Sequence, residues 1–134
     1  MISLILMILA GICKAIQDTL QFHFAKSVFP HNSRFWNPSI SWLNKYKEGP
    51  TGIVDTTKEK FFGSTTVFVS FTDSWHLFGM LNHFLIVAAI VLYSPITPIK
   101  IKVLSILVDF LIIKIAHQSV FHAFYTWIFV KGKK

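Results

Sequence analysis

The chain has 134 residues, of which 53% are hydrophobic and only 14% charged, and its mean hydropathy is +0.56. Soluble domains carry about a quarter charged residues, so this composition, with its apolar residues in long runs, predicts an integral membrane protein of one domain, residues 1–134. The net charge of +7 does not indicate binding to nucleic acid, because the basic residues flank the apolar runs instead of forming one patch, and this favours contact with membrane lipids.

The first predicted span covers about residues 2–24 and begins MISLILMILAGICKA. A signal peptide carries basic residues before its apolar run, and none precedes Lys14, so we expect a retained membrane segment. Cys13 is the single cysteine, which excludes an intrachain disulfide. The second half of this span is more polar and holds Lys14 and Asp18, whose i, i+4 spacing is typical of an ion pair within one helix.

A polar, aromatic-rich loop of about residues 27–61 follows, and prolines at 30, 38 and 50 interrupt any long helix there. Its aromatic residues predict an interfacial belt. The stretch WNPSISWLNKYK predicts a short amphipathic element along the membrane surface. The composition is compatible with a solvated loop that has aromatic anchors, and also with a loop that binds a specific lipid or partner.

The second and third predicted spans cover about residues 64–93 and 99–130, each long enough for the roughly 20 residues that a bilayer requires. The stretch FFGSTTVFVSF would suit a strand, but a lone strand leaves its backbone unpaired in lipid, so we expect a helix from about Gly63. The short connection SPITP predicts that these two helices are antiparallel neighbours. The expected fold is therefore an all-α integral membrane protein with three transmembrane helices and an aromatic-basic loop between the first and second.

The orientation follows from the distribution of lysine and arginine. Nine basic residues flank the long loop or close the chain, whereas only Lys100 and Lys102 lie on the other side. The positive-inside rule then predicts a cytoplasmic loop and C-terminus, with the N-terminus outside. The nine are Lys26, Arg34, Lys45, Lys47, Lys58, Lys60, Lys131, Lys133 and Lys134.

Ionisable side chains inside the predicted spans are the strongest functional signal. A charge at the bilayer centre costs about 3 kcal/mol or more, so such groups usually face a partner or a cavity. A helix rises about 1.5 Å per residue, and counting from the inner boundaries predicts one layer roughly 12 to 24 Å deep. That layer contains Lys14, Asp18, Asp73, His76, His117 and His122. A second layer would pair His83 with Asp109 near the outer face.

One interpretation of the deeper layer is a reactive site. Asp18, Asp73 and His76 would be catalytic, and the same three residues with His117 and His122 would bind a metal. An Asp-x-x-His pair on one helical face suits a divalent metal, which could activate water against a lipid phosphate or ester. A minor variant makes His76 and His117 axial ligands of a haem-type pigment.

The alternative interpretation is structural. The same side chains would neutralise one another, Lys14 with Asp18 and Asp73 with His76 or His117, and thereby specify packing. Conduction of protons or ions is a third possibility. The three-span plan, with the N-terminus outside and a basic C-terminal tail inside, also matches a phage holin, and a second non-enzymatic alternative is an accessory subunit of a larger membrane complex. The polar residues of the third span lie around much of the helix, which is compatible with two partners or a homo-oligomer.

The motifs DTLQFHF, FWNPSISWLNKYK and FFGSTTVFVSFTDSWHLF resemble a group of small uncharacterised membrane proteins of Bacteroidota and their phages. The resemblance covers about residues 11–80. It carries no function to transfer, and it implies only a recurring pattern of twelve residues: Asp18, Trp36, Asn37, Pro38, Trp42, Asn44, Lys45, Tyr46, Lys47, Asp73, Trp75 and His76.

Overall fold

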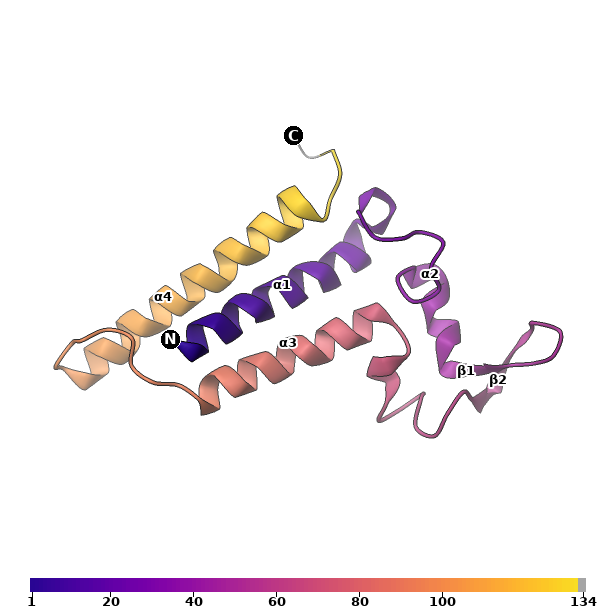
Figure 1. Cartoon of the computed structure of the whole chain (residues 1–134), viewed down its shortest axis with the longest axis horizontal. Helices are drawn as coiled ribbons and strands as arrows, with labels where there is room; N and C mark the ends of the chain where they lie inside the picture. Colours follow the sequence, from indigo (N-terminus) through magenta and orange to yellow (C-terminus); the bar gives the residue numbers. More distant parts are fainter. Residues whose placement is uncertain (133–134) are drawn as a thin grey trace.

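The structure is a computed structural model that describes residues 1–132. Three long helices dominate it: α1 (Ile2–Phe22), α3 (Ser74–Val91) and α4 (Lys102–Ala123), which continues into the π-helical turn η4 (Phe124–Ile128) (Figure 1). All three are long and apolar enough to span a membrane, which confirms the three long apolar helices of the predicted fold. Lys133 and Lys134, which the charge count included, lie outside the described residues.

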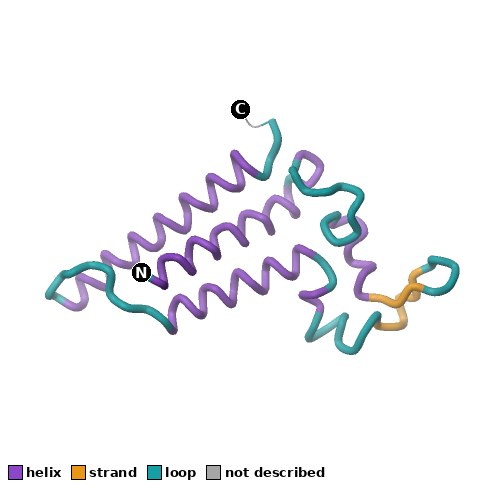
Figure 2. The backbone as a smooth tube through the Cα atoms, in the orientation of Figure 1, coloured by secondary structure: helices purple, strands orange, loops and turns teal. Residues whose placement is uncertain are grey.

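The shorter elements lie almost entirely between α1 and α3 and form a small head at one end of the bundle (Figure 2). The two-stranded sheet within the head was not expected from the sequence. The elements are η1 (Phe24–Lys26), α2 (Pro38–Ser41), η2 (Trp42–Lys45), β1 (Tyr46–Glu48), β2 (Val54–Glu59) and η3 (Val69–Phe71).

Helix α1 is the central element of the bundle. Figure 1 shows it between α3 and α4, and both outer helices pack on α1 while they scarcely touch each other. The predicted neighbour relation between the second and third spans is therefore wrong. The connection over residues 92–101 is long enough to pass the end of α1, so α4 packs on the side of α1 opposite α3.

Small residues allow this close packing. A Cβ atom added to Gly11 would lie 2.8 Å from the backbone oxygen of His117, so the backbones of α1 and α4 nearly touch at that point. At Gly79 an added Cβ would lie 2.7 Å from Nε2 of Gln17 on α1. Helices in membranes associate in this way, because apolar burial gives little driving force in lipid and tight contact must replace it.

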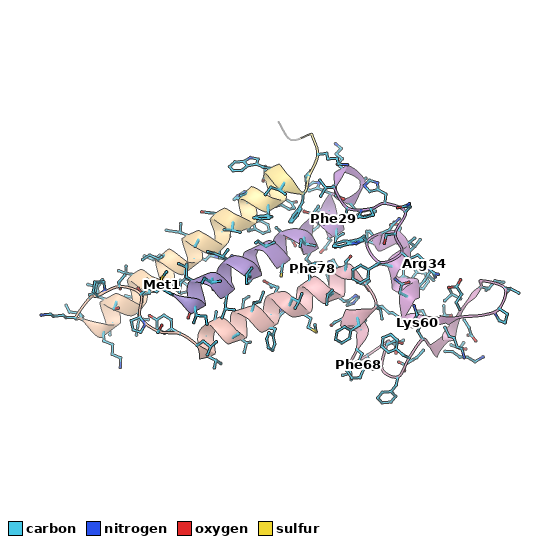
Figure 3. All side chains as sticks on the ribbon, in the orientation of Figure 1. Met1, Phe29, Arg34, Lys60, Phe68 and Phe78 are labelled. Atoms are coloured by element: carbon cyan, nitrogen blue, oxygen red, sulfur yellow. The ribbon has the colours of Figure 1, made fainter. Side chains whose placement is uncertain are left out.

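Aromatic rings join the head to the bundle. Trp36 stacks on Phe29, with centroids 4.6 Å apart, and also lies against Phe78 of α3 at 5.8 Å. Figure 3 labels Phe29 and Phe78. A backbone bridge between Ser27 and Val130 ties the C-terminal segment to the same end. Part of the predicted aromatic belt is therefore packing between the head and the helices, not an exposed anchor.

The second long helix begins ten residues later than predicted, at Ser74 instead of about residue 64. Side-chain hydrogen bonds hold the preceding segment in turns: the Glu59 carboxylate accepts from the backbone N–H groups of Gly63 and Thr65, and Gly63 adopts a positive φ of 73°. Such local side-chain bonds compete with helix formation. The predicted helix over residues 64–73 is wrong for this reason.

Candidate functional site

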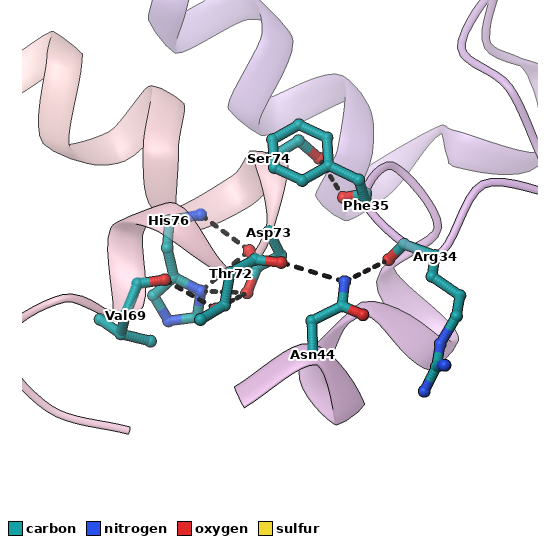
Figure 4. Close-up of polar contacts among 8 residues, drawn as sticks. All are labelled: Arg34, Phe35, Asn44, Val69, Thr72, Asp73, Ser74 and His76. Atoms are coloured by element: carbon teal, nitrogen blue, oxygen red, sulfur yellow. Dashed lines mark hydrogen bonds and ion pairs between the residues drawn. The ribbon is translucent and has the colours of Figure 1, made fainter. Parts of the chain in front are cut away.

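Asp73 is the N-cap of α3 (Figure 4). Its Oδ1 accepts the backbone N–H of His76 at 3.0 Å, which satisfies a helix donor that has no partner inside the helix. The Nδ1 atom of His76 lies 2.9 and 2.7 Å from the two carboxylate oxygens of Asp73. Asp73 is only 2% exposed, so the sequence pattern Asp-x-x-His forms a buried cap together with an imidazole–carboxylate pair.

The head is fastened to the same point. The side-chain amide of Asn44 donates to the backbone oxygens of both Arg34 and Thr72, each at 3.0 Å. Ser74 donates from its backbone and its hydroxyl to the backbone oxygen of Phe35, at 3.0 and 2.9 Å. Figure 4 shows these bonds converging beside the cap. The site around Asp73 thus joins the head to the start of α3.

This geometry changes the predicted depth of the Asp73 pair. Asp73 and His76 occupy the first turn of an 18-residue helix, at its end and beside the head. The sequence count placed them near the middle of a span, because it started that helix at about residue 64. The i, i+3 relation between the two was predicted correctly.

Lys14 and Asp18 form the predicted ion pair within α1, with Nζ and Oδ1 2.7 Å apart. The carboxylate is mostly covered, at 17% side-chain exposure, while the lysine is 41% exposed. Within a membrane such a pairing would let one helix carry both charges, because each would neutralise the other. Asp18 is therefore engaged by a residue of its own helix.

Asp109 organises the connection between α3 and α4. It is fully buried, and it accepts the Tyr93 hydroxyl at 2.8 Å and the backbone N–H groups of Ile96 and Thr97 at 2.7 and 2.9 Å. The hydrogen bond to this carboxylate, together with burial, raises the pKa of Tyr93 above its ordinary value. The predicted His83–Asp109 contact does not form: Nδ1 of His83 lies 2.7 Å from the backbone oxygen of Gly79.

The other two predicted metal ligands lie on α4. The backbone of His117 meets α1 at Gly11, whereas His122 is exposed and its ring lies 6.0 Å from that of Phe121. Among residues 1–132, no group of three or more histidine, cysteine, aspartate or glutamate side chains is placed to hold a metal ion. The structure thus brings Asp73 and His76 together and gives no support to the predicted five-ligand site.

No protein-family model, curated protein or solved structure gives a significant match to this chain. The roles of its residues therefore rest on their geometry alone. Sequence reasoning did not anticipate Asn44, Thr72 and Ser74 as partners in the site. One sequence signal could have identified the cap. Asp73 stands three residues before His76 and directly ahead of a long apolar run, which is where an N-cap residue is expected.

Proposed function

We propose that the protein is a multi-pass membrane protein that acts as a non-enzymatic accessory component of a larger membrane complex. The observation that supports this most is the use of its acids. Asp18, Asp73 and Asp109, the three acids predicted to lie in the spans, each make contacts that build the chain's own structure. Together these contacts stabilise a helical bundle that has a folded head fixed at one end.

The uncovered surface of the helices is large enough to contact both lipid and further protein partners. Of the most apolar stretch in each candidate span, 33% is buried in α1, 22% in α3 and only 11% in α4. A three-helix bundle thus offers most of α3 and α4 to its surroundings. The positive-inside orientation completes the proposal, with the head and the C-terminal segment cytoplasmic and the N-terminus outside.

Purification from membranes in a mild detergent tests the proposal. Alkaline carbonate should leave the chain in the membrane fraction, and protease added to intact cells should spare the head. Native mass measurement should then find the chain in a stoichiometric complex larger than its own 15.4 kDa. Release by carbonate, or a chain that native mass measurement finds only as an isolated monomer, would contradict it. Chemistry on a lipid at Asp18, Asp73 and His76, and a holin-like role, stay predictions of the sequence.

A further inference from the structure

One side of α4 carries a stripe of exposed residues at spacings of three or four. This spacing lines side chains up along one helical face and is the pattern by which helices pair. The stripe, called the α4 seam below, consists of Leu104, Leu107, Leu111, Lys114, Gln118 and His122, all exposed. The half-buried Ala116 and Val120 stand two residues after Lys114 and Gln118, which places them about 200° away around the helix, on the side of α1.

Lys114 is the unusual member of the α4 seam. It lies twelve residues after Lys102 and fourteen before Ile128, the limits of the candidate span. At about 1.5 Å per residue, its Cα is roughly 18 and 21 Å from the two ends. A lysine side chain reaches only part of that distance toward the head groups, so its ammonium would stay within the hydrocarbon, where an unpaired charge is strongly unfavourable.

Among residues 1–132, every carboxylate is either engaged elsewhere or lies in the head, away from Lys114. No ion pair involving Lys114 forms within the described residues. Each acid of the bundle is already engaged, Asp18 by Lys14, Asp73 by His76, and Asp109 by the α3–α4 connection. The other three acids, Glu48, Asp55 and Glu59, lie in the head. A second copy of this chain would bring the same engaged acids, so it does not complement the seam.

We infer that the α4 seam binds a transmembrane helix of a different membrane protein, which places an aspartate or glutamate opposite Lys114. The leucines of the seam would pack against apolar side chains of that helix toward the α3–α4 connection. Gln118 and His122 would hydrogen-bond to it toward the head. An anionic lipid head group is a poor occupant, because Lys114 lies near mid-span. The inference rests on the proposed membrane insertion and names the partner's chemistry.

A synthetic poly-leucine transmembrane peptide with one central aspartate serves as the probe. The full-length chain carries a donor fluorophore, the peptide carries an acceptor, and both are reconstituted in phosphatidylcholine vesicles. Resonance energy transfer between the two labels then gives the affinity of the chain for the peptide. Matched peptides carry asparagine or leucine at the same place. We expect the aspartate peptide to bind about fivefold to thirtyfold more tightly than the leucine peptide, the range found for polar contacts between membrane helices. The asparagine peptide should bind less tightly than the aspartate peptide.

Two variants locate the contact. Lys114→Leu should abolish the preference for aspartate, whereas Lys102→Leu, which removes the same charge at the start of α4, should preserve it. Both side chains are exposed, and circular dichroism of each variant should match the parent. Equal binding of the aspartate and leucine peptides would overturn the inference. So would equal binding of aspartate and asparagine, a preference that survives Lys114→Leu, or self-association of the chain that requires Lys114.

Insertion is measured in the same vesicles, by flotation and protease protection. A chain that fails to insert refutes the proposed membrane function as well. An inserted chain that shows no preference among the peptides refutes only the assignment of the α4 seam.

Discussion

Replacing Asp73 by alanine separates a structural role from a reactive one. The substitution removes the N-cap bond to the His76 backbone and the partner of the His76 imidazole. Loss of an N-cap costs about 0.5 to 2 kcal/mol. A buried donor left without an acceptor costs about 1 to 3 kcal/mol, and the 30% exposure of the His76 side chain favours the lower part of that range.

Because both losses come from one carboxylate, they do not simply add, and we expect Asp73→Ala to lower the free energy of unfolding by about 2 to 3 kcal/mol. Asp73→Asn is the matched control. Asparagine caps helices as well as aspartate does and keeps an acceptor oxygen for His76, so we expect a loss of about 1 kcal/mol or less.

Reversible unfolding in mixed micelles, driven by increasing sodium dodecyl sulfate and followed by circular dichroism, gives these free energies. Hydrogen exchange should also show faster opening at the first turn of α3 in Asp73→Ala. A parent-like unfolding free energy for Asp73→Ala, within about 0.5 kcal/mol, would refute the capping argument. Equal destabilisation by alanine and asparagine would refute the role given to the cap bond.

Three further predictions follow from other contacts. Asp109→Ala removes three hydrogen bonds at a buried site, so exchange of the Ile96 and Thr97 amides should accelerate at least tenfold, whereas unchanged exchange would contradict the assignment. Gly11→Ala should destabilise the bundle by about 1 to 3 kcal/mol because its Cβ meets a backbone oxygen; Gly79→Ala should cost less, since it meets a flexible side chain, and the reverse order in the same unfolding assay would contradict this. The Thr57 hydroxyl, hydrogen-bonded to Asp55, is the largest influence lowering the pKa of Asp55 from 3.8 to about 2. A carboxyl group whose pKa is lower in the folded than in the unfolded state stabilises the fold fully only above its unfolded pKa. The stabilisation of β2 by Asp55 should therefore be complete above pH 4 and lost as the pH falls toward 2, which NMR titration of the hairpin would show.

The sequence was sufficient to predict contacts between residues that are close in the chain. Lys14 with Asp18, and Asp73 with His76, follow from spacings of four and three residues, because helical geometry alone brings such side chains together. The three apolar runs also identified the three long helices, since length and hydropathy are properties of each segment by itself.

The start of α3 depended on contacts that no local pattern encodes. Residues 64–73 mix β-branched, aromatic and polar residues directly before the following apolar run, and the sequence did not show that Ser64 is buried with its hydroxyl donating to the backbone oxygen of Lys45. The same end of α3 receives Asn44 from the head. The ten-residue error in the start of the helix moved Asp73 from mid-span to a helix end, and the predicted metal layer depended on that depth.

What the sequence by itself determined is the set of apolar helices and the ionisable groups that their interiors must neutralise. Only the tertiary structure decided which group meets which. The sequence could not show that α1 would lie between α3 and α4, because that order depends on contacts between helices far apart in the chain, such as the close backbone approach of α1 and α4 at Gly11. This order directs Asp109 to the α3–α4 connection and leaves Lys114 on the outward face of α4, without a partner among the residues described.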